Sequence, residues 1–393
     1  MKITTLGAAV LTLVLVGCAA GPGASPTVLP TDIPPTQTST STGAPSATPT
    51  TSPSGEPSAS PSASLSASPT ATPTAATPAP DAYAWQELSA SDGPPAREDH
   101  TLTLSSDGSA AFLFGGRAGN RTFDDVWRLD LASETWTQLS PEGAAPAGRF
   151  GHVAVWVDDL GLVIWSGQAN ASTFFDDIWA FDPGGLTWTQ LPDGDSVPRA
   201  RYGSCGAIGP DGRLWISHGF TADQARFHDT QAYDFDSGSW QDVTPAEGTP
   251  PVDRCLHDCL WTPDGQFVLY GGQTTGVPAL GDLWALMGEP PASAWQQQPN
   301  PSAAARQLYA LDKLDGRAFI FGGRDLDGDA LADLWLLDLA TLEMIEADPT
   351  GAAPAPRWGA AFVADPQRDR LVLFGGRDAS GALSDTWQLS AQP

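Results

Sequence analysis

The sequence predicts an all-β domain in which one four-stranded unit is repeated six times, preceded by a long segment that has no core. Apolar runs ending in glycine, usually a Gly pair, recur every 51 to 53 residues. An Asp-x-Trp follows nine or ten residues after five of these glycines, which accounts for part of the high count of 15 Trp. A period of about 50 residues is typical of repeat architectures. The six final glycines are Gly116, Gly167, Gly219, Gly272, Gly323 and Gly376.

Residues 1–17 have the pattern of a signal peptide. Lys2 precedes an apolar stretch from Ile3 to Val16, which is too short for a lasting membrane span. The tetrapeptide ending at Cys18 resembles a bacterial lipobox, in which the Cys is lipidated and becomes N-terminal after cleavage. We therefore expect an extracytoplasmic lipoprotein of the cell envelope, held at the outer face of a membrane through Cys18. An ordinary secretory signal that contains a Cys is the alternative.

Residues 18–82 are expected to be a disordered linker behind the lipidated Cys. Pro, Ser, Thr and Ala make up 50 of the 62 residues from 21 to 82. Such a composition cannot bury enough apolar surface to offset the entropy of an ordered backbone. The segment is therefore predicted to hold the following domain away from the membrane.

Each unit of residues 83–393 is interpreted as four short strands. An alternating segment follows an Arg, as in 149–155, and alternation of this kind is typical of a half-buried strand. A two-residue turn such as Asp107-Gly108 leads to the apolar run that ends in glycine. The Asp-x-Trp segment supplies the third strand and a Trp-x-x-Leu segment the fourth. In the third unit, Gln231 replaces the Trp of Asp-x-Trp.

The repeated unit resembles the kelch repeat, and the resemblance covers residues 83–393. It implies a six-bladed β-propeller with four strands in each blade. The segment Trp85-Gln86-Glu87-Leu88 matches a fourth strand, but it precedes the first complete unit, while the sixth unit ends without one. We therefore expect residues 84–89 to form the outer strand of the last blade and to close the ring. The Trp side chains are interpreted as packing between blades.

Six arginines precede the six first strands and are the candidate ligand-binding residues. Repetition should place them at one level near the axis, where they would concentrate positive charge on an acidic body and attract an acidic ligand. In the alternative interpretation, each Arg ties a loop to its neighbouring blade through carbonyls or a carboxylate. The six residues are Arg97, Arg149, Arg201, Arg254, Arg306 and Arg357.

The loop from 325 to 333 differs from its siblings in its density of carboxylates. Asp325, Asp327, Asp329 and Asp333 stand at positions 1, 3, 5 and 9, with Gly328 at position 4. Ca²⁺ is bound by several carboxylates held close by a tight turn, and this spacing resembles extracellular calcium loops. Ca²⁺ is therefore the one cofactor hypothesis, with an ordinary polar loop as the alternative.

Three cysteines lie in the repeats, and outside the cytoplasm a disulfide is expected. Cys255 and Cys259 are four residues apart on one strand, roughly 13 Å, and so cannot pair with each other. Cys205 and Cys259 lie on adjacent blades with opposite strand parity. The sequence therefore predicts a Cys205–Cys259 disulfide.

The charge balance excludes nucleic acid as a partner. The chain has 46 Asp+Glu against 19 Lys+Arg, a formal net charge of −27, and a phosphate backbone requires a basic surface. The same charge disfavours docking on anionic lipid. Membrane contact is therefore expected through the lipid anchor only.

The function expected from these features is a monomeric module that binds a protein or a glycan ligand, with no catalytic residue assigned. A secreted carbohydrate-active enzyme is the rival hypothesis. A kelch mutarotase of the sialic acid type matches in size and compartment, whereas a galactose oxidase-like copper site needs a Tyr–Cys crosslink and further Tyr and His ligands. With only five Tyr in the chain, the second pattern is matched poorly. A structural role in the envelope is the third hypothesis.

Overall fold

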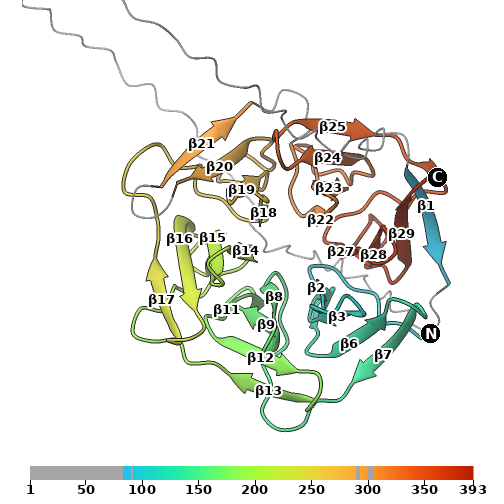
Figure 1. The fold of residues 1–393 in the computed structure, drawn as a ribbon, viewed down its shortest axis with the longest axis horizontal. Helices are drawn as coiled ribbons and strands as arrows, with labels where there is room; N and C mark the ends of the chain where they lie inside the picture. The colour runs from blue at the N-terminus through green and yellow to red at the C-terminus, as the bar shows by residue number, and fades with distance from the viewer. Residues whose placement is uncertain (1–82, 90–91, 289–292, 300–304, 393) are drawn as a thin grey trace, which may run out of the picture. The chain divides into compact units, whose positions relative to one another are not determined.

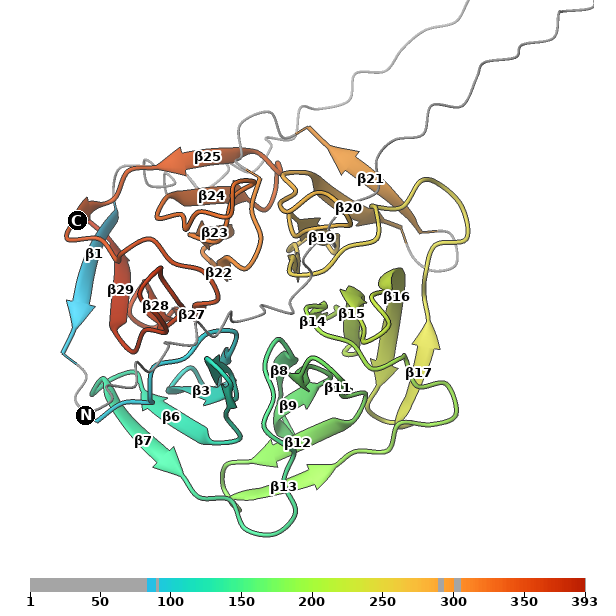
Figure 2. The same ribbon diagram turned by 180° about the vertical axis from the view of Figure 1, so that it is seen from behind.

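A computed structural model of the chain describes residues 83–89, 92–288, 293–299 and 305–392. The predicted signal peptide, the lipidation site Cys18 and the linker lie outside these described residues. Within them the secondary structure is all β, without a helix, and hence with none long and apolar enough to cross a bilayer. Six sheets are arranged in a ring (Figures 1 and 2), which confirms the predicted six-bladed propeller.

Each blade is an antiparallel sheet whose first strand is innermost. Blade 1 contains β2 (Thr101–Leu104), β3 (Ala110–Phe114), β6 (Val126–Asp130) and β7 (Thr135–Leu139). Blade 2 contains β8 (Val153–Val157), β9 (Gly161–Trp165), β12 (Ile178–Asp182) and β13 (Thr187–Gln190). Blade 3 contains β14 (Cys205–Ile208), β15 (Leu214–Phe220), β16 (Arg226–Asp234) and β17 (Ser239–Asp242).

The remaining blades repeat this order. Blade 4 contains β18 (Asp258–Trp261), β19 (Phe267–Tyr270), β20 (Leu283–Met287) and β21 (Ala294–Gln298). Blade 5 contains β22 (Ala310–Leu314), β23 (Arg317–Phe321), β24 (Leu334–Asp338) and β25 (Met344–Ala347). Blade 6 contains β27 (Ala361–Asp365), β28 (Arg370–Phe374), β29 (Thr386–Ala391) and β1 (Tyr83–Leu88). Short hairpins add β4 (Arg117–Ala118), β5 (Arg121–Thr122), β10 (Gln168–Asn170) and β11 (Thr173–Phe174).

Strand β1 closes the ring, as the sequence predicts. It pairs antiparallel with β29 over its whole length, from Tyr83 opposite Ala391 to Leu88 opposite Thr386. On its other side it pairs in parallel with the two-residue strand β26 (Thr350–Gly351). The first and last segments of the domain therefore share one sheet (Figure 1).

The core lies between the blades, because each sheet packs its face against the next sheet. The second strands are the most buried, and every residue of β3, β9 and β28 is inaccessible. The fourth-strand Trp of one blade packs on the second strand of the preceding blade. Ring centroids lie 5.1 Å apart for Trp188 and Phe114, and 5.2 Å apart for Trp136 and Phe374. These contacts fit the predicted role of the Trp side chains.

The propeller has two faces of different construction. The ring face carries the Arg-containing segments that enter the first strands and the loops that follow the Gly pairs. The turn face carries the tight turns between first and second strands, such as Asp107-Gly108. Because the strands of each blade are antiparallel, the start of strand one and the end of strand two lie at the same face.

Candidate binding site

The six predicted arginines lie where the chain enters each innermost strand, and their backbones join neighbouring blades. The Arg149 N–H donates to the carbonyl of Phe123 at 3.1 Å, and its own carbonyl accepts from the Gly116 N–H at 2.8 Å. Phe123 and Gly116 belong to the loop of blade 1, and the same two bonds recur at the other five arginines. A Cβ on Gly115 would lie 2.5 Å from the Arg149 carbonyl oxygen, which explains why glycine is favoured there.

The side chain of each Arg binds a carboxylate of its own blade. In blade 1, Arg97 donates to both oxygens of Asp125 at 2.7 and 2.8 Å and to the Gly115 carbonyl at 2.8 Å. Trp127 donates to the same carboxylate at 2.7 Å. The Asp is therefore the first residue of the Asp-x-Trp pattern. The six pairs are Arg97–Asp125, Arg149–Asp177, Arg201–Asp229, Arg254–Asp282, Arg306–Asp333 and Arg357–Asp385.

Blade 3 keeps this arrangement with a different donor. Gln231 replaces the Trp, and its amide donates to Asp229 at 3.1 Å.

The paired Arg also changes the pKa of its aspartate. Burial raises the pKa of Asp125 and of Asp177, but hydrogen bonds and the charge of the paired Arg outweigh burial and hold both pKa values below the ordinary one. The motif is thus a buried ion pair with all of its hydrogen bonds made inside the domain.

All six guanidinium groups are inaccessible, with exposed fractions of 0 or 1% for the whole residues. The ligand-binding hypothesis requires these side chains to be exposed at the mouth of the ring. Because none of the six is exposed, none can contact an acidic ligand there. The placement favours the structural interpretation, with one correction: the backbone reaches the neighbouring blade, whereas the carboxylate belongs to the same blade.

The four carboxylates of the candidate calcium loop do not come together. Asp325 accepts backbone N–H groups of Asp327 and Asp329, both at 2.9 Å, and so closes a tight turn. Asp333 is turned away into the ion pair with Arg306 and the hydrogen bond from Trp335. In the described part of the chain, no three His, Cys, Asp or Glu side chains are grouped to hold a metal ion. In this arrangement the segment from 325 to 333 is an ordinary polar loop, which was the alternative to a Ca²⁺ site.

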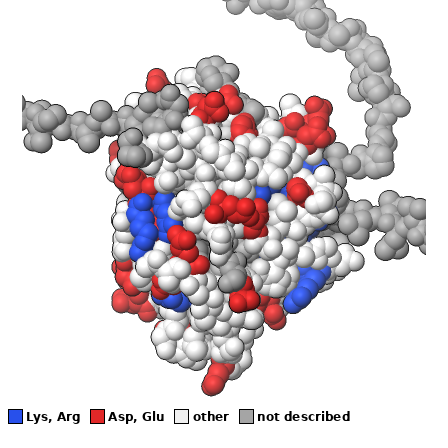
Figure 3. Space-filling view, turned by 90° about the vertical axis from the view of Figure 1, so that its right-hand side faces the viewer, with Lys and Arg blue, Asp and Glu red and all other residues white. Residues whose placement is uncertain are grey.

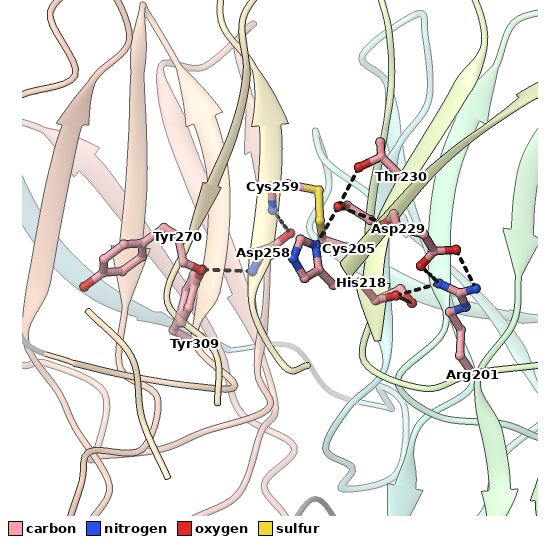
Figure 4. The surroundings of a disulfide bond; sticks show 11 residues. Arg201, Cys205, His218, Asp229, Thr230, Asp258, Cys259, Tyr270 and Tyr309 are labelled. Atoms are coloured by element: carbon pink, nitrogen blue, oxygen red, sulfur yellow. Dashed lines mark hydrogen bonds and ion pairs between the residues drawn. A yellow bond between two sulfur atoms is a disulfide. The ribbon is translucent and has the colours of Figure 1, made fainter. Parts of the chain in front are cut away.

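Cys205 and Cys259 are joined by a disulfide between the innermost strands of blades 3 and 4 (Figure 4). Their Cα atoms are 5.5 Å apart, and the bond links positions 54 residues apart in the chain. The disulfide confirms the pair predicted from the opposite strand parity of adjacent blades.

A closed ring of six backbone hydrogen bonds surrounds the axis and was not foreseen. The residue two positions after each Arg donates its N–H to the corresponding carbonyl of the preceding blade, at 2.7 to 3.1 Å. All six adopt positive φ, between 56° and 65°. Three are glycine, while Asp99, Leu256 and Leu308 accept the strain. The ring consists of Asp99, Gly151, Gly203, Leu256, Leu308 and Gly359.

A second set of arginines lies on the ring face and is partly exposed. Arg117, Arg324 and Arg377 directly follow the Gly pairs of blades 1, 5 and 6, which are consecutive around the ring. Each forms a backbone bridge with the residue that follows a buried Arg. Gly-Gly-Arg is the sequence signal of this second set, and it occurs at 115–117, 322–324 and 375–377.

Two of these arginines are neutralised by carboxylates of blade 1. Arg117 lies 3.0 Å from Asp99 and 3.5 Å from Glu98, and Arg377 lies 3.2 Å from Glu98. Burial, followed by the charge of Asp99, raises the pKa of Glu98 to about 7 against the opposing effect of both arginines. Burial likewise raises the pKa of Asp99.

Arg324 differs because no carboxylate pairs with it among the described residues. Its guanidinium donates twice to the Gly328 carbonyl, at 3.0 and 2.8 Å, and stacks over the half-buried Trp358 ring at 4.8 Å from the centroid. The hydrogen bonds and the stacking hold the group in place, and it forms no ion pair with a carboxylate of the described residues. Arg324 and Trp358 therefore form a fixed cationic platform.

Exposed apolar side chains lie on loops of the same face as this platform. Leu326 is 54% exposed in the loop after Arg324, and Val277 and Val252 are exposed on loops of blade 4. In the described residues only Ile345, on outer strand β25, is a further large apolar side chain of this kind. Seen from the side in Figure 3, acidic side chains are spread over the surface and basic ones appear in few places. Blades 4 and 5 thus combine exposed apolar groups with an unpaired cation on the ring face.

The comparisons with known proteins agree with this architecture. The model of the KLHDC2/KLHL20/DRC7 Kelch-repeats domain matches residues 78–272 and 263–392. An F-box/kelch-repeat protein of Arabidopsis thaliana is 27% identical over 67% of this chain and 59% of its own length. Adagio-like protein 3 of Oryza sativa is 27% identical over 54% of this chain and 37% of its own length.

A human relative is covered more completely. Kelch domain-containing protein 3 is 22% identical over 74% of this chain and 80% of its own length. The chain thus spans less than two thirds of the two plant relatives and most of the human one. Because the family model covers nearly all of residues 78–392 and the structure has six kelch-type blades, the chain belongs to the kelch-repeat family.

Proposed function

We propose that this chain is a lipid-anchored, extracytoplasmic recognition module that binds a protein ligand through blades 4 and 5 of its ring face. Kelch propellers generally mediate protein interactions, which makes a protein the first choice of ligand over a glycan. The observation that carries the proposal is Arg324, a fixed guanidinium without a carboxylate partner among the described residues, in the loop that also exposes Leu326.

The ligand segment expected at this site carries a carboxylate next to apolar side chains. A guanidinium held by two hydrogen bonds and an aromatic ring loses little entropy when it binds a carboxylate in a bidentate geometry. The exposed Leu326 and Val277 offer the apolar area that protein interfaces bury. Arg117 and Arg377 are a weaker choice because Glu98 and Asp99 already compensate their charge.

Substituting Arg324 should weaken binding of acidic peptides about tenfold. A displayed library of 12-residue peptides is selected on the full chain, and the affinities of the recovered peptides are measured for the parent, Arg324→Ala and Trp358→Ala. The tenfold loss corresponds to about 1.4 kcal/mol, typical of a charge-assisted hydrogen bond.

The control for this experiment is Arg128→Ala. Arg128 is another partly exposed arginine, 33% accessible in its side chain and paired with Asp130 on β6. It lies away from the ring-face loops, so its loss should leave peptide affinity within twofold of the parent. If the selected peptides are not acidic, or if both arginine variants weaken binding equally, the ring-face site is wrong.

The anchor is tested by replacing Cys18. In a bacterial host the parent chain should incorporate labelled palmitate and sediment with membranes, whereas Cys18→Ser should do neither. Several acyl chains on one residue exceed the two signals that stable anchoring requires. Protease added to intact cells should reach the domain if it is displayed outside. Equal labelling of both chains, or a protected domain, would contradict the proposed location.

A further inference from the structure

The central cavity is bounded by the innermost strands of all six blades and has a volume of about 580 Å³. The six-residue backbone ring forms its end toward the ring face. Its other end reaches Trp156, Trp261 and Lys313, and a second cavity of about 440 Å³ on the turn face shares Ile208, Trp261 and Lys313 with it. The cavity therefore reaches the turn face, opposite the proposed protein-binding site.

The wall between these two ends is mostly apolar and contains two carboxylates. Side chains such as Val155, Leu260 and Ala310 provide the apolar surface. Apart from Asp99 in the backbone ring, the acidic residues of the wall are Asp258 on β18 and Asp312 on β22. Apolar pockets with a few convergent polar groups are the usual form of small-molecule sites.

Asp258 has one carboxylate oxygen without a partner among the described residues. Its Oδ1 accepts the backbone N–H of Cys259 at 2.8 Å, while no hydrogen bond or ion pair reaches its second oxygen. Its backbone is fixed, because its N–H donates to the Tyr309 hydroxyl at 2.9 Å and this hydroxyl donates to the Tyr270 carbonyl at 2.6 Å (Figure 4). The side chain thus starts from a rigid position on the cavity wall.

Asp312 adds negative charge without offering an open oxygen. Its two oxygens accept the backbone N–H groups of Lys313 and Ala364, each at 2.7 Å. Lys313 is the only Lys or Arg on the cavity wall, and it lies at the turn-face end with its ammonium group donating to the Trp261 carbonyl at 3.1 Å. The interior of the cavity therefore has an excess of negative charge.

We propose that this cavity binds a small organic amine with an apolar stem. The ammonium group donates to the open oxygen of Asp258 and is attracted by Asp312, while the stem lies along the apolar wall. A carboxylate in an apolar cavity is poorly solvated, so an ammonium partner relieves its desolvation. An anion would be repelled, and a neutral ligand would leave both carboxylates uncompensated.

The proposed pairing predicts that affinity rises with pH. Burial, followed in effect by the charge of Asp312, raises the pKa of Asp258 to about 7. Burial also raises the pKa of Asp312, so its charge is lost in the same direction as the pH falls. The other titratable groups around Asp258 are Tyr309 and His257, which stay neutral, because burial raises the pKa of Tyr309 well above its usual range and lowers that of His257 to about 3. Asp258 must be ionised to pair with ammonium, so binding should weaken as the pH falls from 8 to 6.

Hexylamine, hexanol and hexanoate are suitable probes because they share one stem and differ in the charge of the head group. Titration calorimetry on the full chain at pH 8 should show hexylamine binding at least about tenfold more tightly than hexanol, and hexanoate more weakly still. Asp258→Asn should reduce hexylamine affinity about tenfold and leave hexanol unchanged, and Asp312→Asn should reduce it less.

Two controls separate the cavity from general charge effects. Asp236→Asn removes one negative charge from an exposed residue outside the cavity and should leave hexylamine affinity unchanged. Lys313→Met should raise it by removing a cation from the turn-face end of the cavity. Thermal melting checks that each variant is folded. The proposal is overturned if hexylamine and hexanol bind equally, if hexylamine does not bind at millimolar concentration, or if Asp236→Asn matches Asp258→Asn.

Discussion

Deletion of residues 83–89 from the otherwise complete chain is expected to abolish the cooperative unfolding transition of the propeller. The deletion removes β1 and leaves β29 as an open sheet edge. It also removes the buried side chains of Tyr83 and Trp85 from the boundary of blades 5 and 6, and that of Leu88 from the boundary of blades 6 and 1. Without β1 the chain no longer connects blade 6 to blade 1 covalently. The remaining bonds between these blades, such as Asp99 N–H to the Gly359 carbonyl and the Arg377–Glu98 ion pair, are not expected to hold the ring closed, so blade 6 should separate from its neighbours.

A milder variant tests the same closure without deleting backbone. Trp85 is 4% exposed and packs against Phe321 and Phe362, with ring centroids 4.9 and 6.0 Å away. Trp85→Ala should lower the free energy of unfolding by about 3–5 kcal/mol. Gln86→Ala, at the exposed next position of the same strand, is the control and should cost less than about 1 kcal/mol. Equal urea midpoints for the two variants would contradict a closing role for β1.

Removing the aspartate of one buried ion pair should lower the free energy of unfolding about as much as Trp85→Ala. Asp177→Ala leaves the Arg149 guanidinium inaccessible and unpaired, and an arginine cannot lose its charge to escape this. Removing one partner of a buried pair costs about 3–5 kcal/mol. Urea unfolding of the parent and the variant at pH 7 measures this loss.

Removing the arginine of the pair should lower the free energy of unfolding less than removing the aspartate. In Arg149→Met, the remaining Asp177 side chain is 24% exposed and can be hydrated or protonated. Because the pKa of Asp177 is held below its usual value, the stabilisation from the pair is present above that usual value and is lost as the pH falls through the lowered one. The cost of Asp177→Ala should therefore shrink in strong acid. If Arg149→Met is the more destabilising substitution, the argument from the trapped arginine fails.

The fold was accessible from sequence because its signals are local and repeated. Each copy of the unit presents a similar alternation and the same terminal glycine, and four of the six share an Asp-Gly turn, so that six weak signals in register predict four strands per blade. The closing strand was identified for the same reason, since Trp85 and Leu88 occupy the places of Trp136 and Leu139. Strand parity between adjacent blades likewise selected Cys205 and Cys259.

The candidate site was predicted less accurately than the fold. The repeat shows at which height along the propeller axis a residue lies, but it does not show whether the side chain is exposed. Arg149 and Arg324 both lie near the axis on the ring face, yet the first is paired with a carboxylate 28 residues away and the second is open to solvent. The backbone ring through Asp99 depends on six residues that meet only after the circle closes. Likewise, Asp258 and Asp312 belong to different blades, and they line one cavity only when blades 4 and 5 pack side by side.

The sequence by itself therefore determined the repeat, the number of blades, the strand that closes the ring and the class of protein, because these depend on local hydrophobic patterns and turn residues. Only the tertiary structure decided which charges are buried in ion pairs, which arginine keeps an open partner site, and where the cavity ends. Those properties depend on the distances between side chains that are remote in the chain, and one carboxylate at hydrogen-bonding distance is enough to turn a candidate ligand-binding arginine into a buried structural residue.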